Sequence, residues 1–270
     1  MGLFQKAVDR VTDTKMTQKR RKRMIVFVAV ITLLSMVTST VAWFSVNTFA
    51  GVDTLDVHIS VAAQLRVSME DHGKDLNQYV KIITNEMIDG YLGSKANTRL
   101  ADLKLDPVTS TDGVRMVNRS GAVREPNRKS YLEFECYFIA TEPMWVHLTT
   151  ESSDIAGDRG TQVTSASPAP QSEVTQCTRV SFSTDSNGTA TYEPNKSGAV
   201  NSLNTFDIGT PMSYTDSSRL FHLDELEPKK VTIRLWVDGE DPQCDDDVQD
   251  ADLNVALSFV GTDDNNVPIS

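Results

Sequence analysis

The sequence predicts an all-β protein, an antiparallel β-sandwich or jelly-roll ectodomain preceded by one N-terminal transmembrane or signal helix. Three observations predict it. Apolar and polar residues alternate with a period of two in several segments spread between residues 55 and 259. Strand-like segments do not alternate with helical ones, so antiparallel pairing is the economical arrangement. A charge-free apolar segment also separates a basic N-terminal head from a long acidic body.

The charge of the chain is unevenly distributed. The 270 residues carry a formal net charge of −11. Residues 1–23 hold eight Lys or Arg against two Asp, a net charge of +6, which leaves −17 for the rest. Phosphate binding needs clustered Lys and Arg, so the acidic body argues against a nucleic-acid partner. A basic head followed by an acidic body indicates two environments rather than one cytosolic globule.

The boundary between the two charge regimes is the apolar segment 24–42. Its nineteen residues contain no charge and, as a helix, reach about the 30 Å of a bilayer's hydrocarbon core. The basic residues 19–23 directly precede it, so we expect residues 1–23 to form a cytoplasmic head and the body to be exported. A signal peptidase can read Thr40-Val41-Ala42 and cleave between Ala42 and Trp43. A retained signal anchor fits the length equally well.

The exported part, residues 43–270, is expected to form one acidic β-sandwich domain with long polar loops. The period-two pattern predicts strands at 55–61, 65–69, 131–138, 145–149, 179–183, 231–237 and 253–259. Only residues 78–92 have a weakly helical pattern. The polar stretches 151–176 and 183–218 contain no cluster of reactive residues, so we expect disorder or decoration there.

Three cysteines lie in the exported part, where disulfides persist. Cys136 falls on the apolar face of its predicted strand and is expected to be a buried free thiol. Cys177 precedes one predicted strand and Cys244 follows another, and cysteines at strand ends can approach to the Cα separation that a disulfide needs. We therefore predict a disulfide between Cys177 and Cys244, with three free thiols as the alternative.

An acidic cluster follows the predicted strand 231–237. Oxygen-rich extracellular loops can bind calcium, and the candidate ligands in this cluster are Asp238, Glu240, Asp241 and Asp245. The spacing does not match an EF-hand loop, and a solvated acidic turn is the favoured interpretation. The four histidines lack paired ligand spacing, and no nucleophile elbow, phosphate loop or dinucleotide turn is present. We therefore expect no catalytic residues and no cofactor, with calcium at the acidic turn as the alternative.

The membrane boundary also carries a family resemblance. The basic head, the apolar segment and Val41-Ala-Trp-Phe-Ser45, leading into an alternating strand, resemble the TasA/camelysin group of exported bacterial proteins. The block 232–244, followed by 253–259, is similar to the closing strands of Gram-positive surface proteins with the same signal. The resemblance implies cleavage after Ala42 by a SipW-type signal peptidase and a jelly-roll body. It also implies extracellular or biofilm-matrix fibres in which each subunit receives a neighbour's N-terminal strand.

The fibre hypothesis also has a physical basis in the sequence. An apolar alternating strand within residues 43–61 could complete another subunit's sheet by strand addition, or it could pair within its own sandwich. We expect a non-enzymatic bacterial cell-surface or matrix protein, secreted or anchored, with fibre assembly as its role. The alternative is a membrane-anchored ectodomain that binds a glycan or protein ligand through its loops. The peptidase activity ascribed to camelysin is not carried over, because no metal-binding triad is identifiable.

Overall fold

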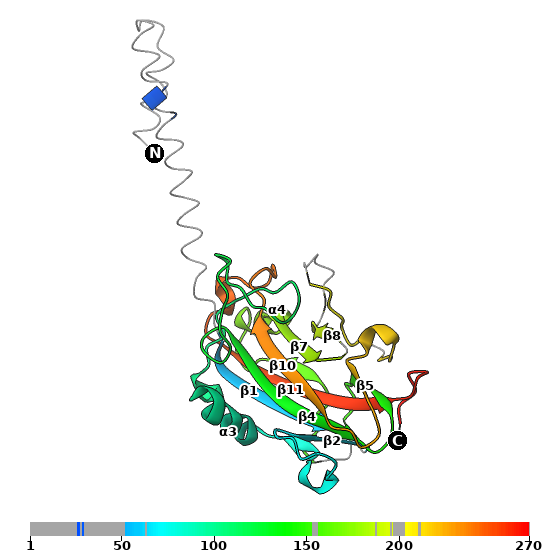
Figure 1. Cartoon of the computed structure of the whole chain (residues 1–270). Coiled ribbons are helices and arrows are strands. Elements are labelled where there is room, and N and C mark those ends of the chain that lie inside the picture. The colour runs from blue at the N-terminus through cyan, green and yellow to red at the C-terminus, as the bar shows by residue number, and fades with distance from the viewer. Residues whose placement is uncertain are drawn as a thin grey trace, which may run out of the picture. The chain divides into compact units, whose positions relative to one another are not determined.

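The computed structural model describes residues 26, 27, 29, 52–62, 64–152, 156–186, 188–194, 196, 203–209 and 212–269 (Figure 1). The predicted head 1–23 and the predicted cleavage site between Ala42 and Trp43 lie outside the described residues. Of the segment 24–42, only Val26, Phe27 and Ala29 are described, and they are helical. Within the described residues, no helix has the length and apolar character needed to cross a membrane. The chain divides into units 1–48 and 49–270, and the two sheets belong to the second unit.

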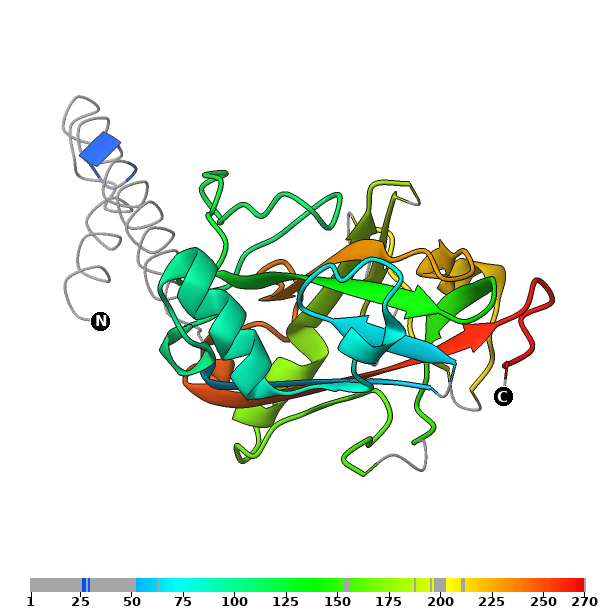
Figure 2. The same cartoon turned by 60° about the horizontal axis from the view of Figure 1, so that its bottom comes forward.

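The fold is mostly β, with two sheets that form two layers (Figure 2). The strands are β1 (Val52–Val61), β2 (Leu65–Ser68), β3 (Ile82–Ile83), β4 (Tyr131–Ala140), β5 (Met144–Leu148), β6 (Gln162–Thr164), β7 (Thr178–Thr184), β8 (Gly188–Tyr192), β9 (Phe221–Leu223), β10 (Lys229–Val237) and β11 (Ala251–Thr262). Sheet A has the order β3-β1-β11-β5-β9, and β6 also pairs with β11. Sheet B has the order β2-β4-β10-β7-β8 and is entirely antiparallel. The prediction of a predominantly β, two-sheet protein is thus confirmed.

One part of the fold prediction is wrong, because sheet A is mixed rather than antiparallel. β1 and β11, the first and last strands, run parallel in register from Thr54 opposite Asp252 to Val61 opposite Phe259. The period-two pattern determines which face of a strand is buried, but not the direction of its neighbour. Pairing between strands so far apart in sequence needs no hairpin, so either direction is available to the chain.

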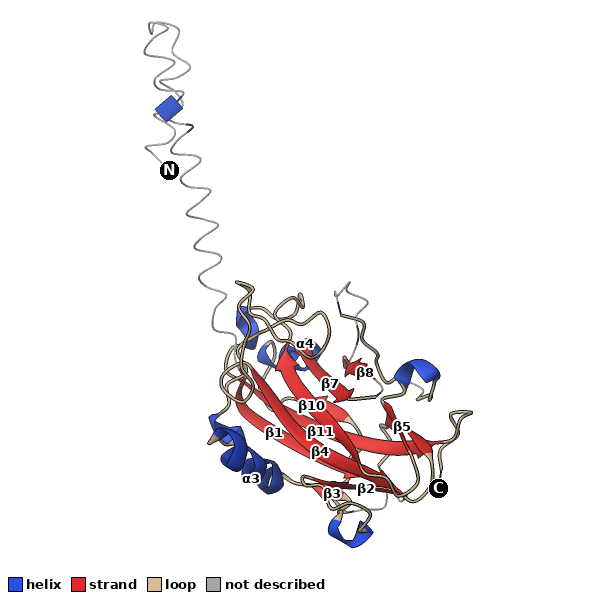
Figure 3. Cartoon of the chain, viewed as in Figure 1, coloured by secondary structure: helices blue, strands red, loops and turns tan. Residues whose placement is uncertain are grey.

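The helices are few and short (Figure 3). The α-helices of the described body are α3 (Asn85–Ala96) and α4 (Val174–Cys177), and the 3₁₀ turns are Leu76–Gln78, Leu100–Asp102, Gln171–Glu173, Asp216–Ser218 and Asp246–Val248. The helical pattern predicted for 78–92 therefore begins too early, since β3 occupies part of it. The stretches expected to be disordered or decorative also contain β6, α4 and β8, which corrects that expectation for their described parts.

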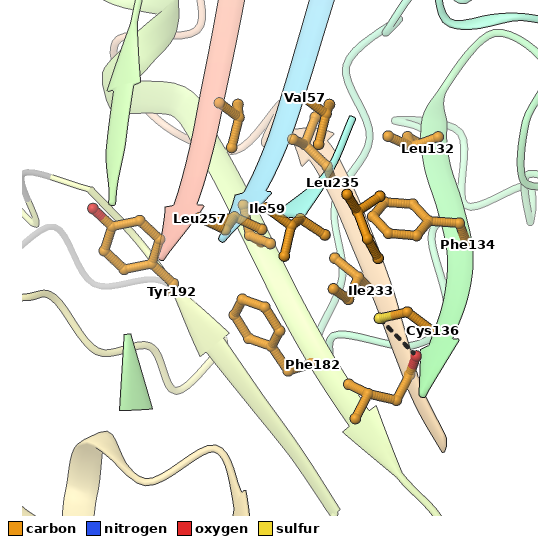
Figure 4. Close-up of a cluster of buried hydrophobic side chains, with 14 of the residues drawn as sticks. Val57, Ile59, Leu132, Phe134, Cys136, Phe182, Tyr192, Ile233, Leu235 and Leu257 are labelled. Carbon is orange, nitrogen blue, oxygen red and sulfur yellow. Dashed lines mark hydrogen bonds between the residues drawn. The ribbon is translucent and has the colours of Figure 1, made fainter. Parts of the chain in front are cut away.

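The inner faces of both sheets share one apolar core (Figure 4). Val57, Ile59 and Leu257 of sheet A lie opposite Phe134 and Leu235 of sheet B, and all five are at most 1% exposed. An aromatic cluster joins the layers further along. Its ring centroids are 5.2 Å apart for Phe138–Phe221, 5.0 Å for Phe138–Phe259 and 5.7 Å for Phe182–Phe259. Such tilted and edge-to-face pairs add to the hydrophobic stabilisation of area burial.

A long segment between α3 and β4, residues 104–130, covers part of the outer face of sheet B. Val108 and Met116 from this segment form a second small apolar cluster with Tyr131 and Trp236. Trp236 points outward from β10 and is nevertheless fully buried. The backbone of Val108 bonds both to the end of β10 and to Gly239, which holds the segment in place. This covering creates the buried outer surface on which the charged residues described below lie.

Candidate functional site

The strand of greatest functional interest is β1, because the fibre hypothesis depends on it. β1 supplies the buried side chains of Leu55, Val57, Ile59 and Val61, each at most 4% exposed. One of its edges pairs with β11 along nearly its whole length. The other edge meets β3 at two residues only, and the Val57 N–H donates to Asn85 Oδ1 at 3.0 Å. β1 therefore completes sheet A and closes its core, and it is held there mainly by its pairing with β11.

The edge of sheet B at β2 and β4 is short and is partly blocked by side chains. β2 covers β4 only as far as Tyr137. Beyond that point, Asn127 takes the place of a strand: its side-chain amide donates to the Glu133 carbonyl at 2.7 Å and accepts from the Glu133 N–H at 2.7 Å. The Tyr91 hydroxyl hydrogen-bonds to the backbone of Glu135. Short and side-chain-paired edges disfavour addition of a foreign strand, so this edge of sheet B is a poor place for strand addition.

The acidic cluster predicted as a calcium site is divided between two environments. Asp238 and Asp241 are buried and face the guanidinium of Arg179, with Asp238 Oδ2 3.8 Å from Arg179 Nε. Glu240 and Asp245 are exposed, and Asp245 Oδ1 accepts a hydrogen bond from a backbone N–H of its own turn. No group of three or more His, Cys, Asp or Glu in the described part of the chain is arranged to hold a metal ion.

Arg179 is the centre of this cluster and was not identified from the sequence. It is fully buried, and its guanidinium contacts three carboxylates: Glu193 at 3.1 Å, Asp241 and Asp238. Burial raises the pKa of Asp238 to about 6, and the positive charge of Arg179 only partly opposes that shift. A period-two pattern places Arg179 on the outer face of β7, where a charged residue ordinarily meets solvent. No local signal could therefore have predicted its burial.

Two of the three cysteines lie beside this cluster. The Cys177 thiol shares a hydrogen bond with Cys244, and that contact together with burial raises the pKa of Cys177. The structure describes both as free thiols, so the Cys177–Cys244 disulfide stays a prediction. Cys136 is fully buried in the core, as expected, and burial raises the pKa of its thiol. The two cysteines chosen as partners are thus neighbours, and Cys136 packs elsewhere, in the core between the sheets.

The outer face of sheet A holds a different kind of buried polar residue, His147 on β5. The side chain is 1% exposed. Its Nδ1 lies 3.1 Å from Ser218 Oγ, its ring packs edge-on against Tyr214, and its Nε2 has no hydrogen-bond partner. Burial, assisted by the positive charge of Arg219, lowers the pKa of His147 to about 4. The side chain of His58, the other histidine within a predicted strand, lies outside the described part of the chain.

A groove of about 650 Å³ lies between α3, the loop after β2 and the outer face of β4. Its size falls within the range of small-ligand sites. The wall formed by α3 presents Met87, Gly90, Tyr91 and Lys95, which share one helix face, and Tyr137 of β4 contributes to the opposite side. The sequence contained one signal for this groove, namely Gly90 inside the weakly helical pattern 78–92.

Comparison with known proteins gives no relatives. No protein-family model matches the chain, and no curated protein or solved structure is significantly similar to it.

Proposed function

We propose that this chain is a non-enzymatic structural protein of the bacterial cell surface or extracellular matrix, whose subunits join by exchanging β1. The observation that carries the proposal is the pairing of β1. It is the first strand of the described body, and its covalent connection to the other strands is at its C-terminal end only. It fills the position beside β11 with four core side chains. A strand held in this way can be supplied by another copy with the same register and the same burial.

The proposal includes a finer description of the fold, a sandwich of jelly-roll type. What supports it is the way the chain moves between the layers. β1, β3, β5, β9 and β11 belong to sheet A, and β2, β4 and β10, which are interspersed among them, belong to sheet B. Repeated crossing between two sheets around one core is typical of Greek-key and jelly-roll proteins.

The proposal also includes export, with residues 1–23 in the cytoplasm and the body on the outer side of the membrane. The basic block directly before the apolar segment 24–42 supports this orientation. Cleavage between Ala42 and Trp43 by a signal peptidase would release the N-terminal end of β1 for exchange. Retention of segment 24–42 would tether β1 to the membrane beside its own subunit, and would favour pairing within one chain.

Strand exchange is tested by crosslinking across the β1–β11 register. Ser60 lies opposite Ser258, so cysteines at these positions can form a disulfide. Chains carrying only Ser60→Cys are coexpressed with chains carrying only Ser258→Cys, with the native cysteines replaced by alanine. We expect covalent dimers on non-reducing gels. Monomers alone would contradict exchange.

A matched control fixes the register. Thr262→Cys lies on the same face of β11, four residues further along, or about 13 Å away. It should not crosslink to Ser60→Cys if dimers report β1 pairing. Mass spectrometry of the mature N-terminus is the independent test of release: an intact Met1 in the membrane fraction would contradict a secreted fibre.

A second function, an anchored ectodomain that binds a ligand, is favoured by one specific observation. The groove beside α3 is large enough for a small molecule or for the end of a glycan or peptide chain. The two functions differ in a simple observable. A fibre subunit forms crosslinked assemblies through β1, whereas a binding module stays monomeric and requires the groove.

A further inference from the structure

We propose that the groove beside α3 is a binding site for aliphatic primary amines, which place their ammonium groups against carboxylates and their alkyl chain against tyrosine and methionine side chains. This inference goes beyond the structural role proposed above and does not depend on strand exchange. Figure 2 shows α3 and the cyan loop after β2 side by side, with β4 behind them. The groove between them is lined from all three elements.

The first argument comes from the shape of α3. Gly90 and Gly93 lie within this 12-residue helix, where glycine is unfavourable compared with alanine. Neither glycine has a positive φ, and a Cβ added at either one would meet no atom within 4 Å. Neither backbone conformation nor close packing therefore requires glycine. Gly90 lines the groove and Gly93 does not. The missing side chain at position 90 therefore leaves open space in the groove.

The second argument comes from charge. Glu70, Asp71 and Glu135 line the groove, and Lys95 is its one lysine or arginine. Glu135 already pairs with Lys230 at 3.2 Å. Glu70 and Asp71 form no salt bridge to any residue in the described part of the chain. Glu70 and Asp71 outnumber Lys95, so the groove keeps a net negative charge. This charge repels an anionic ligand and attracts a cation, and so it selects the ligand class.

The third argument comes from the apolar lining. The lining also includes two tyrosines, Tyr91 and Tyr137, and two methionines, Met69 and Met87. Tyrosine faces attract ammonium groups, and flexible methionines adapt to an alkyl chain. Carboxylates beside aromatic and thioether groups suit a ligand with a charged head and an apolar stem. Free diamines and lysine side chains share this chemistry.

The test compares two ligands of equal length with the full-length chain in detergent. The ligands are 1,5-diaminopentane and its uncharged counterpart 1,5-pentanediol, titrated by calorimetry at low ionic strength. We expect the diamine to bind with a dissociation constant of about 1 mM and the diol to bind at least about tenfold more weakly. Equal binding of both ligands, or binding of neither, would overturn the proposal. Titration with a lysine-containing peptide then distinguishes free amines from lysine side chains as the natural source.

Variants locate the site. Glu70→Gln with Asp71→Asn should weaken diamine binding by about fivefold or more, because both charges are removed while the amides still accept hydrogen bonds. Gly90→Ala and Gly93→Ala should each raise the melting temperature of the protein, since both improve helix propensity. Only Gly90→Ala should weaken diamine binding. If Gly93→Ala weakens it equally, or the double carboxylate variant binds normally, the groove is not the site.

Discussion

The outer faces of the two sheets bury polar groups in opposite ways. On sheet B, the segment 104–130 and the turn after β10 enclose an ionic cluster, in which one guanidinium, that of Arg179, contacts three carboxylates. On sheet A, the buried group is His147, a neutral imidazole that contacts a serine hydroxyl and the Tyr214 ring. One face thus depends on charges that compensate each other, and the other depends on a group that remains uncharged.

This difference has an energetic consequence. Buried ions are tolerated only as a set, because removing one partner leaves the others without compensation in a medium of low dielectric constant. A buried neutral imidazole needs no compensating charge, and it becomes strongly destabilising when it takes up a proton. The outer face of sheet B around Arg179, the ionic face, should therefore be sensitive to substitution. The outer face of sheet A around His147, the neutral face, should lose stability in acid.

The largest expected effect is that of removing Arg179. Arg179→Met keeps an apolar stem but leaves Glu193, Asp238 and Asp241 buried without a cation. We expect the free energy of unfolding to fall by about 3–5 kcal/mol, measured by urea denaturation at pH 7. Adding Glu193→Gln to this variant should restore part of the loss, since one uncompensated charge is then removed.

The control for this prediction lies on the neighbouring strand. Arg234 pairs with Glu133 at 2.6 Å on the same outer face of sheet B, but its side chain is 12% exposed and that of Glu133 is 26% exposed. Arg234→Met should therefore destabilise the fold by about 1 kcal/mol or less. If the two substitutions cost the same, burial is not what distinguishes the Arg179 cluster.

The next largest effect concerns the cysteines at the edge of the ionic face. Under oxidising conditions we expect Cys177 and Cys244 to form the predicted disulfide, which would fix the turn that carries Asp241. Cys244→Ser should then lower the free energy of unfolding by about 2–4 kcal/mol relative to the oxidised protein, and by much less after reduction. Non-reducing peptide mapping identifies the bonded pair. Cys136→Ala is the control, and this variant should still form the Cys177–Cys244 disulfide. A bridge that includes Cys136 would contradict the prediction.

The contrast between the two faces also explains how far the sequence could predict the fold. The long strands are predictable because alternation in segments such as 231–237 and 253–259 reports a buried face directly. β9 has three residues and β3 has two, too few for a period to appear. The parallel direction of β1 beside β11 leaves no trace in either strand, because alternation encodes faces alone.

The ionic cluster around Arg179 could not be predicted from the sequence, for a different reason. The acidic turn 238–247 was identified, but its partner is Arg179, roughly sixty residues earlier, and the cover is the segment 104–130. Alternation assigns Arg179 to an outer face, and only tertiary contacts between distant segments make that face a buried one. The cysteine neighbours were predictable because both lie at the ends of recognisable strands.

The neutral face is tested by acid. The pKa of His147 is lowered to about 4 from an ordinary value of 6.5. The unfolded chain therefore binds a proton before the folded protein does. The contribution of His147 to the free energy of unfolding is complete above pH 6.5 and is lost as the pH falls toward 4, by about 3 kcal/mol in all. His147→Asn should remove this loss, measured by urea denaturation between pH 7 and 4. His222→Asn, on the adjacent strand with its side chain 30% exposed, controls for removal of an imidazole.

The ionic face should respond to acid in the opposite direction. The pKa of Asp238 is raised to about 6 from an ordinary value of 3.8, so in this case the folded protein binds a proton first. The contribution of Asp238 to the free energy of unfolding is complete below pH 3.8 and is lost as the pH rises through 6, by about 3 kcal/mol. In the natural chain, His147 lowers and Asp238 raises the free energy of unfolding as the pH falls from 6 to 4, so the two effects oppose each other. His147→Asn should leave a protein that gains stability on acidification across this range, and Asp238→Asn one that loses it. If both variants have the same slope as the natural chain, the two faces do not titrate as their burial predicts.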